Sequence, residues 1–214
     1  TRYTCMDTEY EAGVEMGRFF AEKGIKTAAI YGAFIPNPMH VYRVAGVLSG
    51  LGLSYDGATE EGEVVGKIFT DQSVDLSKIS GDIQIVSYLQ GYGDTTTDEI
   101  NAAIQAKPEA FISVGMATTF FTQQLNAAGI EFSDIDSFTQ SNGEAITNGK
   151  LVYLAGKYSS SVGPAFALVL NAINGNVIRD EQGNAVSLSQ NYQVATDEAT
   201  FDEFYKSDNG LHFH

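Results

Sequence analysis

The chain has 214 residues, and its 12 basic and 27 acidic side chains give a formal net charge of -15. A surface this acidic repels phosphate backbones and anionic lipid head groups, which excludes nucleic acid and membrane surfaces as expected partners. Hydrophobic residues make up 43% of the chain, enough to bury a substantial core. Cys5 is the single cysteine, so an intrachain disulfide and a cysteine-based metal cluster are excluded.

Short apolar runs alternate with amphipathic stretches, a pattern typical of βαβ units. The expected fold is α/β: a doubly wound, mainly parallel sheet with helices on both faces, in a flavodoxin-like order. The expected strands are Arg2–Met6, Thr27–Tyr31, Glu63–Phe69, Ile83–Tyr88, Ala110–Val114, Ile135–Thr139, Leu151–Ala155 and Tyr192–Ala195.

Helices are expected where apolar residues recur at helical spacing and a glycine or a capping residue marks an end. One of them is capped by Asp94 or one of Thr95–Thr97 and runs to Ala106. The others are Thr8–Lys23, Met39–Leu51, Met116–Ala128, Asn142–Thr147, Ser159–Ile173 and Asp197–Tyr205. Residues Asn176–Ser189 are expected to form a loop or a hairpin, and the tail Ser207–His214 shows no periodicity.

Motifs for nucleotide binding and for catalysis are missing from the sequence. It contains no G-x-G-x-x-G, G-x-x-x-x-G-K-[ST], H-E-x-x-H or G-x-S-x-G motif. The serine run Ser159–Ser161 beside Lys157 is favoured as a helix cap over a Ser–Lys nucleophile. His212 and His214 lie in the terminal tail rather than in a metal-binding pattern. No enzyme activity, cofactor or metal site is therefore expected.

Three stretches occur in a characteristic order and spacing. The first stretch is Asp7–Gly13, followed by Gly24 and Arg43–Gly46. The second is Lys107–Val114, followed by Leu125–Gly129. The third is Ile146–Leu151, followed by Ser161–Gly163 and Ile173–Gly175. Together they resemble the type I periplasmic sugar-binding proteins. These are the ribose- and galactose-binding solute receptors of ABC importers, and their fold is shared with the effector domains of lac-repressor-type regulators. The resemblance covers residues 5–176.

The resemblance implies two α/β lobes joined by three crossing segments, with the ligand between the lobes. Residues 1–150 would form the second lobe, and 151–190 a strand and helix that return to a first lobe whose main part is absent. Residues 191–214 would form the final crossover strand, a short helix and the tail. Because the chain begins with Thr1, we expect an upstream part, with a signal peptide and a lipid anchor, to have been removed.

The resemblance also implies where the ligand would bind. The implied ligand-binding residues are Phe34, His40, Arg43, Met116, Thr139, Gln140 and Lys157, with hinge segments near Asp7, Lys157 and Val194. The family's sugar-binding arginine is replaced by Val41, and the aspartate that closes the strand after Val114 by Thr139 or Gln140.

Two of these residues have alternative interpretations. Arg43 matches a position that supports a loop through a structural ion pair. Lys157 replaces a family glutamine, and would suit a carboxylate- or phosphate-bearing ligand unless it is a solvated lysine at the rim.

The function implied is an extracytoplasmic solute-binding protein, monomeric and without cofactor. It would bind a small polar ligand, either sugar-like or a small anionic metabolite, by closure of the two lobes, and deliver it to an ABC permease. Three alternatives remain open: the effector domain of a transcriptional regulator, the sensor domain of a membrane-bound receptor, and a flavodoxin- or Rossmann-like enzyme.

Overall fold

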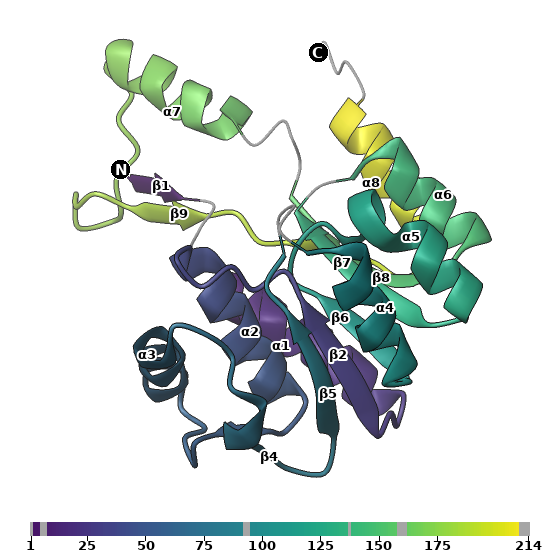
Figure 1. Ribbon diagram of the computed structural model, residues 1–214. Coiled ribbons are helices and arrows are strands. Elements are labelled where there is room, and N and C mark those ends of the chain that lie inside the picture. The colour runs from purple at the N-terminus through teal and green to yellow at the C-terminus, as the bar shows by residue number, and fades with distance from the viewer. Residues whose placement is uncertain (1, 5–7, 92–94, 137, 158–161, 210–214) are drawn as a thin grey trace.

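The computed structural model describes residues 2–4, 8–91, 95–136, 138–157 and 162–209. A six-stranded sheet, with strand order β10-β8-β7-β6-β2-β5, forms the centre of the molecule (Figure 1). All neighbouring strands pair in parallel except β10, which runs antiparallel to β8. The strands are β2 (Thr27–Tyr31), β5 (Gln84–Leu89), β6 (Ala110–Ser113), β7 (Glu131–Asp136), β8 (Leu151–Gly156) and β10 (Gln193–Ala195). The predicted mainly parallel α/β fold is confirmed.

Helices cover both faces of this sheet, as expected for a doubly wound fold. One face is covered by α1 (Glu9–Glu22) and α2 (Pro38–Gly50), and α3 (Glu61–Asp71) packs against α2. The other face packs against α4 (Thr97–Gln105), α5 (Ala117–Ala128), α6 (Gln140–Asn148) and α8 (Glu198–Asn209). The side chains of successive strand residues alternate between the two cores: Ala28 and Ile30 face the first, Ala29 and Tyr31 the second.

Two expected strands are wrong in kind or in position. Residues Glu63–Phe69 are helical and belong to α3, where Val64, Val65 and Ile68 form one buried face. Residues at this spacing lie along one side of a helix, and the prediction of a strand does not take this spacing into account. The strand expected over Ile135–Thr139 is β7, which ends three residues earlier, at Asp136.

A smaller part of the chain lies apart from the six-stranded sheet (Figure 1). It contains α7 (Val162–Ile173) and a two-stranded parallel sheet of β1 (Arg2–Thr4) and β9 (Ser187–Ser189). Helix α7 exposes Phe166, Val169, Leu170 and Ile173. Within the described ranges, no helix has both the length and the apolarity needed to cross a bilayer. Short strands β3 (Ser54–Tyr55) and β4 (Ile79–Ser80) pair beside α3, with a 3-10 turn, η1 (Leu76–Lys78), before β4.

Helices α1 and α2 pack at very short range through glycines on both helices. A Cβ atom added at Gly13 would lie 2.2 Å from the carbonyl oxygen of Arg43, and one added at Gly46 would lie 2.1 Å from that of Tyr10. Real Cβ atoms do not approach other atoms so closely, so both positions require glycine. The contact brings the first turn of α1 against α2, and this places Glu9 beside Arg43.

Candidate functional site

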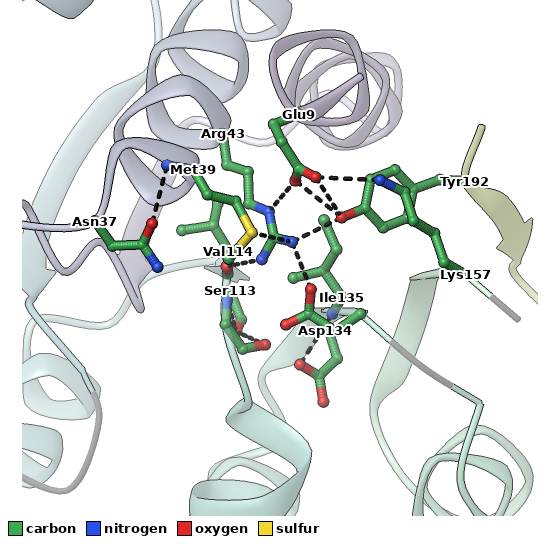
Figure 2. A network of polar contacts seen from close by, with 12 residues as sticks. Glu9, Asn37, Met39, Arg43, Ser113, Val114, Asp134, Ile135, Lys157 and Tyr192 are labelled. Carbon is green, nitrogen blue, oxygen red and sulfur yellow. Dashed lines mark hydrogen bonds and ion pairs between the residues drawn. The ribbon is translucent and has the colours of Figure 1, made fainter. Parts of the chain in front are cut away.

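A cluster of charged side chains lies where strands β6, β7 and β8 end. Asp136 is the last residue of β7, Lys157 directly follows β8, and the carbonyl of Val114 directly follows β6. Open α/β sheets bind ligands beside the carboxyl ends of their parallel strands, so this edge is the candidate functional site. Figure 2 shows Arg43 at the centre of the cluster, reaching in from α2.

Arg43 is almost completely buried, with 1% of its side chain exposed. Its Nε donates to Oε2 of Glu9 at 2.6 Å, and its Nη1 donates to the carbonyl oxygen of Val114 at 3.0 Å. Its Nη2 donates to Oδ1 of Asp136, to the Tyr192 hydroxyl at 2.7 Å and, more weakly, to the sulfur of Met39. Burial disfavours the positive charge, but the negative charges and hydrogen bonds around it outweigh this effect and raise the pKa of Arg43.

Glu9 is the second buried charge of the cluster. Besides Arg43, its carboxylate accepts hydrogen bonds from the Tyr192 hydroxyl, at 2.9 and 3.1 Å, and from Nζ of Lys157, at 3.2 Å. The Lys157 ammonium also lies 4.1 Å from the centroid of the Tyr192 ring, a favourable cation–π position. Burial is the main cause that raises the pKa of Tyr192, so its hydroxyl stays protonated.

The charges of this cluster balance within the protein. Arg43 and Lys157 supply two positive charges, and Glu9 and Asp136 supply two negative ones. Asp136 is the most exposed of the four, with 37% of its side chain accessible. Its backbone has a φ of 105°, a strained conformation for a residue other than glycine, and such strain concentrates at functional sites.

Asp134 supports this edge from inside the sheet (Figure 2). Its carboxylate accepts hydrogen bonds from the backbone N–H of Thr118 at 3.0 Å, from Nδ2 of Asn142 at 3.3 Å and from the backbone N–H of Ile135 at 3.0 Å. These contacts join the end of β7 to the first turns of α5 and α6. Burial raises the pKa of Asp134 to about 7, although its hydrogen bonds act in the opposite direction.

Of the ligand-binding residues expected from the sequence, the structure brings Arg43 and Lys157 together in the cluster. His40 is buried on α2, where its Nδ1 accepts the backbone N–H of Phe34 at 3.2 Å. Burial lowers the pKa of His40 to about 4, with a smaller effect from Arg43, so the imidazole is neutral near pH 7. Met116 precedes α5 and is 39% exposed.

The other expected residues lie at different places. Thr139 is the N-cap of α6, where it forms a capping box with Asn142, and the amide of Gln140 donates to Glu144 at 3.0 Å. Both side chains therefore act within α6. Val194 lies in β10 and pairs with Ala155, whereas Asp7 falls outside the described residues.

Sequence reasoning missed Glu9, Asp136 and Tyr192. A strand that ends at Thr139 has Asp136 in its interior, whereas in the structure Asp136 is the last residue of β7. The position of the strand end could have been corrected from the alternation of side chains along β7, in which Phe132, Asp134 and Asp136 alternate with Ser133 and Ile135. Glu9 and Tyr192 carry no local signal, since their partners are distant in the sequence.

Within the described residues, no group of three or more histidine, cysteine, aspartate or glutamate side chains could hold a metal ion. The cluster at the strand ends can instead offer hydrogen bonds. Its carboxylates accept them, and its buried guanidinium and ammonium hold the carboxylates in place.

Comparison with known proteins gave matches among solved structures only: no family model and no curated protein matches the chain. A periplasmic solute-binding protein of an ABC transporter from Actinobacillus succinogenes 130z, with bound D-allose, matches with a TM-score of 0.61 and 15% identity. The match covers 95% of this chain and 63% of that protein. The arabinose-binding component of an ABC transporter from Shewanella sp. ANA-3 matches with a TM-score of 0.60 and 16% identity, over 100% of this chain and 67% of the other.

The fructose-binding periplasmic domain of the hybrid two-component system BT1754 matches with a TM-score of 0.66 and 13% identity. This match covers 97% of the chain and 62% of that domain. The chain therefore spans less than two thirds of the length of the Actinobacillus protein and of the BT1754 domain. The order of the strands, the two helical layers and these matches together show that the chain has the fold of the type I periplasmic sugar-binding proteins.

Proposed function

We propose that the chain is the ligand-binding part of an extracytoplasmic solute-binding protein whose ligand is a small, uncharged, sugar-like molecule. The observation that carries the proposal is the charge balance at the carboxyl ends of β6, β7 and β8. Arg43 and Lys157 are both paired with carboxylates of the protein. An anionic ligand would have to compete with Glu9 and Asp136 for these cations, so the sugar-like alternative is favoured over the small anionic metabolite.

Asp136 is the residue we expect to contact the ligand. Its carboxylate is partly exposed and held by Arg43, so it can accept hydrogen bonds from ligand hydroxyl groups without moving. A fixed acceptor of this kind loses little conformational freedom when a ligand binds. The ligand-binding roles of Phe34, His40, Arg43, Met116, Thr139, Gln140 and Lys157, and hinges near Asp7 and Val194, remain part of the proposal.

The domain organisation is proposed on the same basis. Residues 1–150 would form the second lobe, and 151–190 would return to a first lobe that packs on α7 and on the β1–β9 pair. Support comes from the exposed apolar side chains of α7, with Ile173 76% and Phe166 66% exposed, and from the partial coverage of the matched structures. Apolar faces of this size in soluble proteins are usually covered by a partner or by another part of the chain.

The proposed biological role is delivery of the ligand to an ABC permease, by a monomeric, non-enzymatic protein anchored outside the cytoplasm. A specific observation favours a second candidate, because one matched structure is the periplasmic domain of a hybrid two-component system. The chain could then serve as the sensing domain of a membrane-bound receptor. Copurification of the longer protein with a permease or with a kinase distinguishes the two roles.

The ligand proposal is tested by thermal denaturation of the chain, and of the longer protein that the domain proposal implies, with neutral sugars and with small anions. Neutral sugars such as D-allose, L-arabinose and D-fructose are expected to raise the melting temperature. Saturation at 100 times the Kd would add about 2.7 kcal/mol to the free energy of unfolding.

Asp136→Asn should weaken this effect at least tenfold in Kd, whereas the exposed control Asp82→Asn should leave it unchanged. Stabilisation by phosphate esters or carboxylates alone would contradict the choice of an uncharged ligand. Turnover of any sugar would contradict the non-enzymatic role.

A further inference from the structure

The chain passes three times between the six-stranded sheet and the smaller part formed by β1, α7 and β9 (Figure 1). The first passage leads from β1 to α1, the second from β8 to α7, and the third from β9 to β10. Any movement of one part relative to the other must therefore be accommodated in these three connections.

One residue of the charged cluster stands at the sheet end of each connection. Glu9 is the first residue of α1, Lys157 directly follows β8, and Tyr192 directly precedes β10. The three residues are far apart in the sequence, yet Figure 2 shows them in contact beside Arg43. Lys157 and Tyr192 both donate hydrogen bonds to the carboxylate of Glu9, at 3.2 and 2.9 Å.

Glu9 is the member of the three that accepts hydrogen bonds from both of the others. The side chain of Glu9 is 5% exposed, and its carboxylate is held against α2 by the ion pair with Nε of Arg43. Two backbone-linked contacts strengthen the same junction. The backbone N–H of Lys157 donates to the carbonyl oxygen of Asp136 at 3.0 Å. The Thr8 hydroxyl donates to the carbonyl oxygen of Gln190 at 3.4 Å.

We infer that Glu9 is a positioning residue that ties all three connections to the six-stranded part. The six-stranded sheet and its charged cluster then move as one unit relative to the smaller part. The buried carboxylate is suited to this role because a buried ion pair is lost at high cost when one partner is removed.

The inference is tested by measuring the distance distribution between the two parts with spin labels. One label is placed at Ile173 of α7 and the other at Gln105 of α4, in a Cys5→Ser background. Both label positions are exposed. Glu9→Gln keeps the size of the side chain but removes its charge, and should broaden the distribution by half or more.

Glu11→Gln, an exposed substitution on the same helix, is the matched control and should leave the width unchanged. Val65→Ala in the buried face of α3 lowers stability at a site remote from the connections, so it should also leave the width unchanged. These controls separate loss of positioning from general destabilisation.

Two results would overturn the inference. One is a Glu9→Gln distribution as narrow as that of the parent protein, and the other is a Val65→Ala distribution as broad as that of Glu9→Gln. The experiment requires no ligand, so its outcome is independent of whether the protein binds a sugar.

Discussion

The carboxylate of Glu9 lies 2.6 Å from Nε of Arg43, although the two residues belong to different helices and are 34 positions apart in the sequence. The contact exists because α1 and α2 pack through glycines on both helices. Through it, a helix-packing feature of the core determines the geometry of the charged cluster at the strand ends. The stability of the fold and the arrangement of the candidate site are therefore linked.

Replacing Arg43 by methionine should destabilise the protein by about 3–5 kcal/mol, because it removes the buried guanidinium that pairs with both Glu9 and Asp136. Chemical denaturation of the variant and of the parent protein measures this difference. Arg18→Met, at an exposed position on α1, should change the free energy of unfolding by less than about 0.5 kcal/mol. Equal effects of the two substitutions would show that the buried network adds nothing to stability.

Gly13→Ala should lower stability by at least about 1–3 kcal/mol, the usual range for overpacking a core. The added methyl group would meet the backbone of α2, which cannot turn away as a flexible side chain can. The matched control is Gly62→Ala on α3, where a Cβ atom has no neighbour within 4 Å. This second change should stabilise the protein by about 0.4–1 kcal/mol, because alanine restricts the unfolded chain.

Melting curves of both glycine variants give opposite shifts if the close contact of α1 and α2 is as described. A Gly13→Ala protein as stable as the parent would contradict this contact.

His40 should make the protein less stable as the pH falls from about 6.5 to about 4. Its pKa in the folded protein is lowered to about 4, mainly by burial, while the unfolded chain binds a proton near pH 6.5. The contribution of neutral His40 to the free energy of unfolding is therefore complete above pH 6.5, and it is lost as the pH falls from 6.5 to about 4. A shift of this size corresponds to about 3 kcal/mol.

The measurement compares the parent with His40→Asn, which retains an acceptor for the N–H of Phe34 but does not titrate. The difference in free energy of unfolding between the two proteins should shrink as the pH falls to 4. A constant difference between pH 7.5 and pH 4.5 would exclude this role of the histidine.

Tyr153→Phe should leave stability unchanged or raise it by up to about 1 kcal/mol. The Tyr153 hydroxyl is buried and has no hydrogen-bond partner among the described residues, so the protein gains nothing from it in return for its lost hydration. Tyr88→Phe is the counterpart, because the Tyr88 hydroxyl donates to the carbonyl oxygen of Ala33. This variant should lose about 1 kcal/mol, so its denaturation midpoint should fall, whereas that of Tyr153→Phe should stay the same or rise.

Much of the fold could be predicted because the signals are local. The buried strand β6 and the helices ended by Gly24 and Gly129 follow directly from periodicity and from glycine stop signals. Helix α3 was misassigned because its buried face consists of only Val64, Val65 and Ile68, and so short an apolar stretch fits a strand as well as a helix.

The candidate site could be predicted only in part. Arg43 and Lys157 were identified from the resemblance, but their partners are not local: Asp136 is 93 positions from Arg43, and Glu9 is 148 positions from Lys157. Such pairs depend on the packing of whole helices and strands, and the sequence carries no short-range sign of them. An error of three residues at the end of β7 was enough to hide the aspartate that we now expect to contact the ligand.

The contact between Arg43 and Tyr192 has a consequence for the order in which the protein assembles during translation. The two residues are 149 positions apart, and β10, which completes one edge of the sheet, follows Tyr192 directly. During translation, α2 therefore leaves the ribosome long before Tyr192, which contacts Arg43, has been made. Until then the cluster lacks the hydroxyl group that bonds both Arg43 and Glu9, so it cannot be complete before β10 is made.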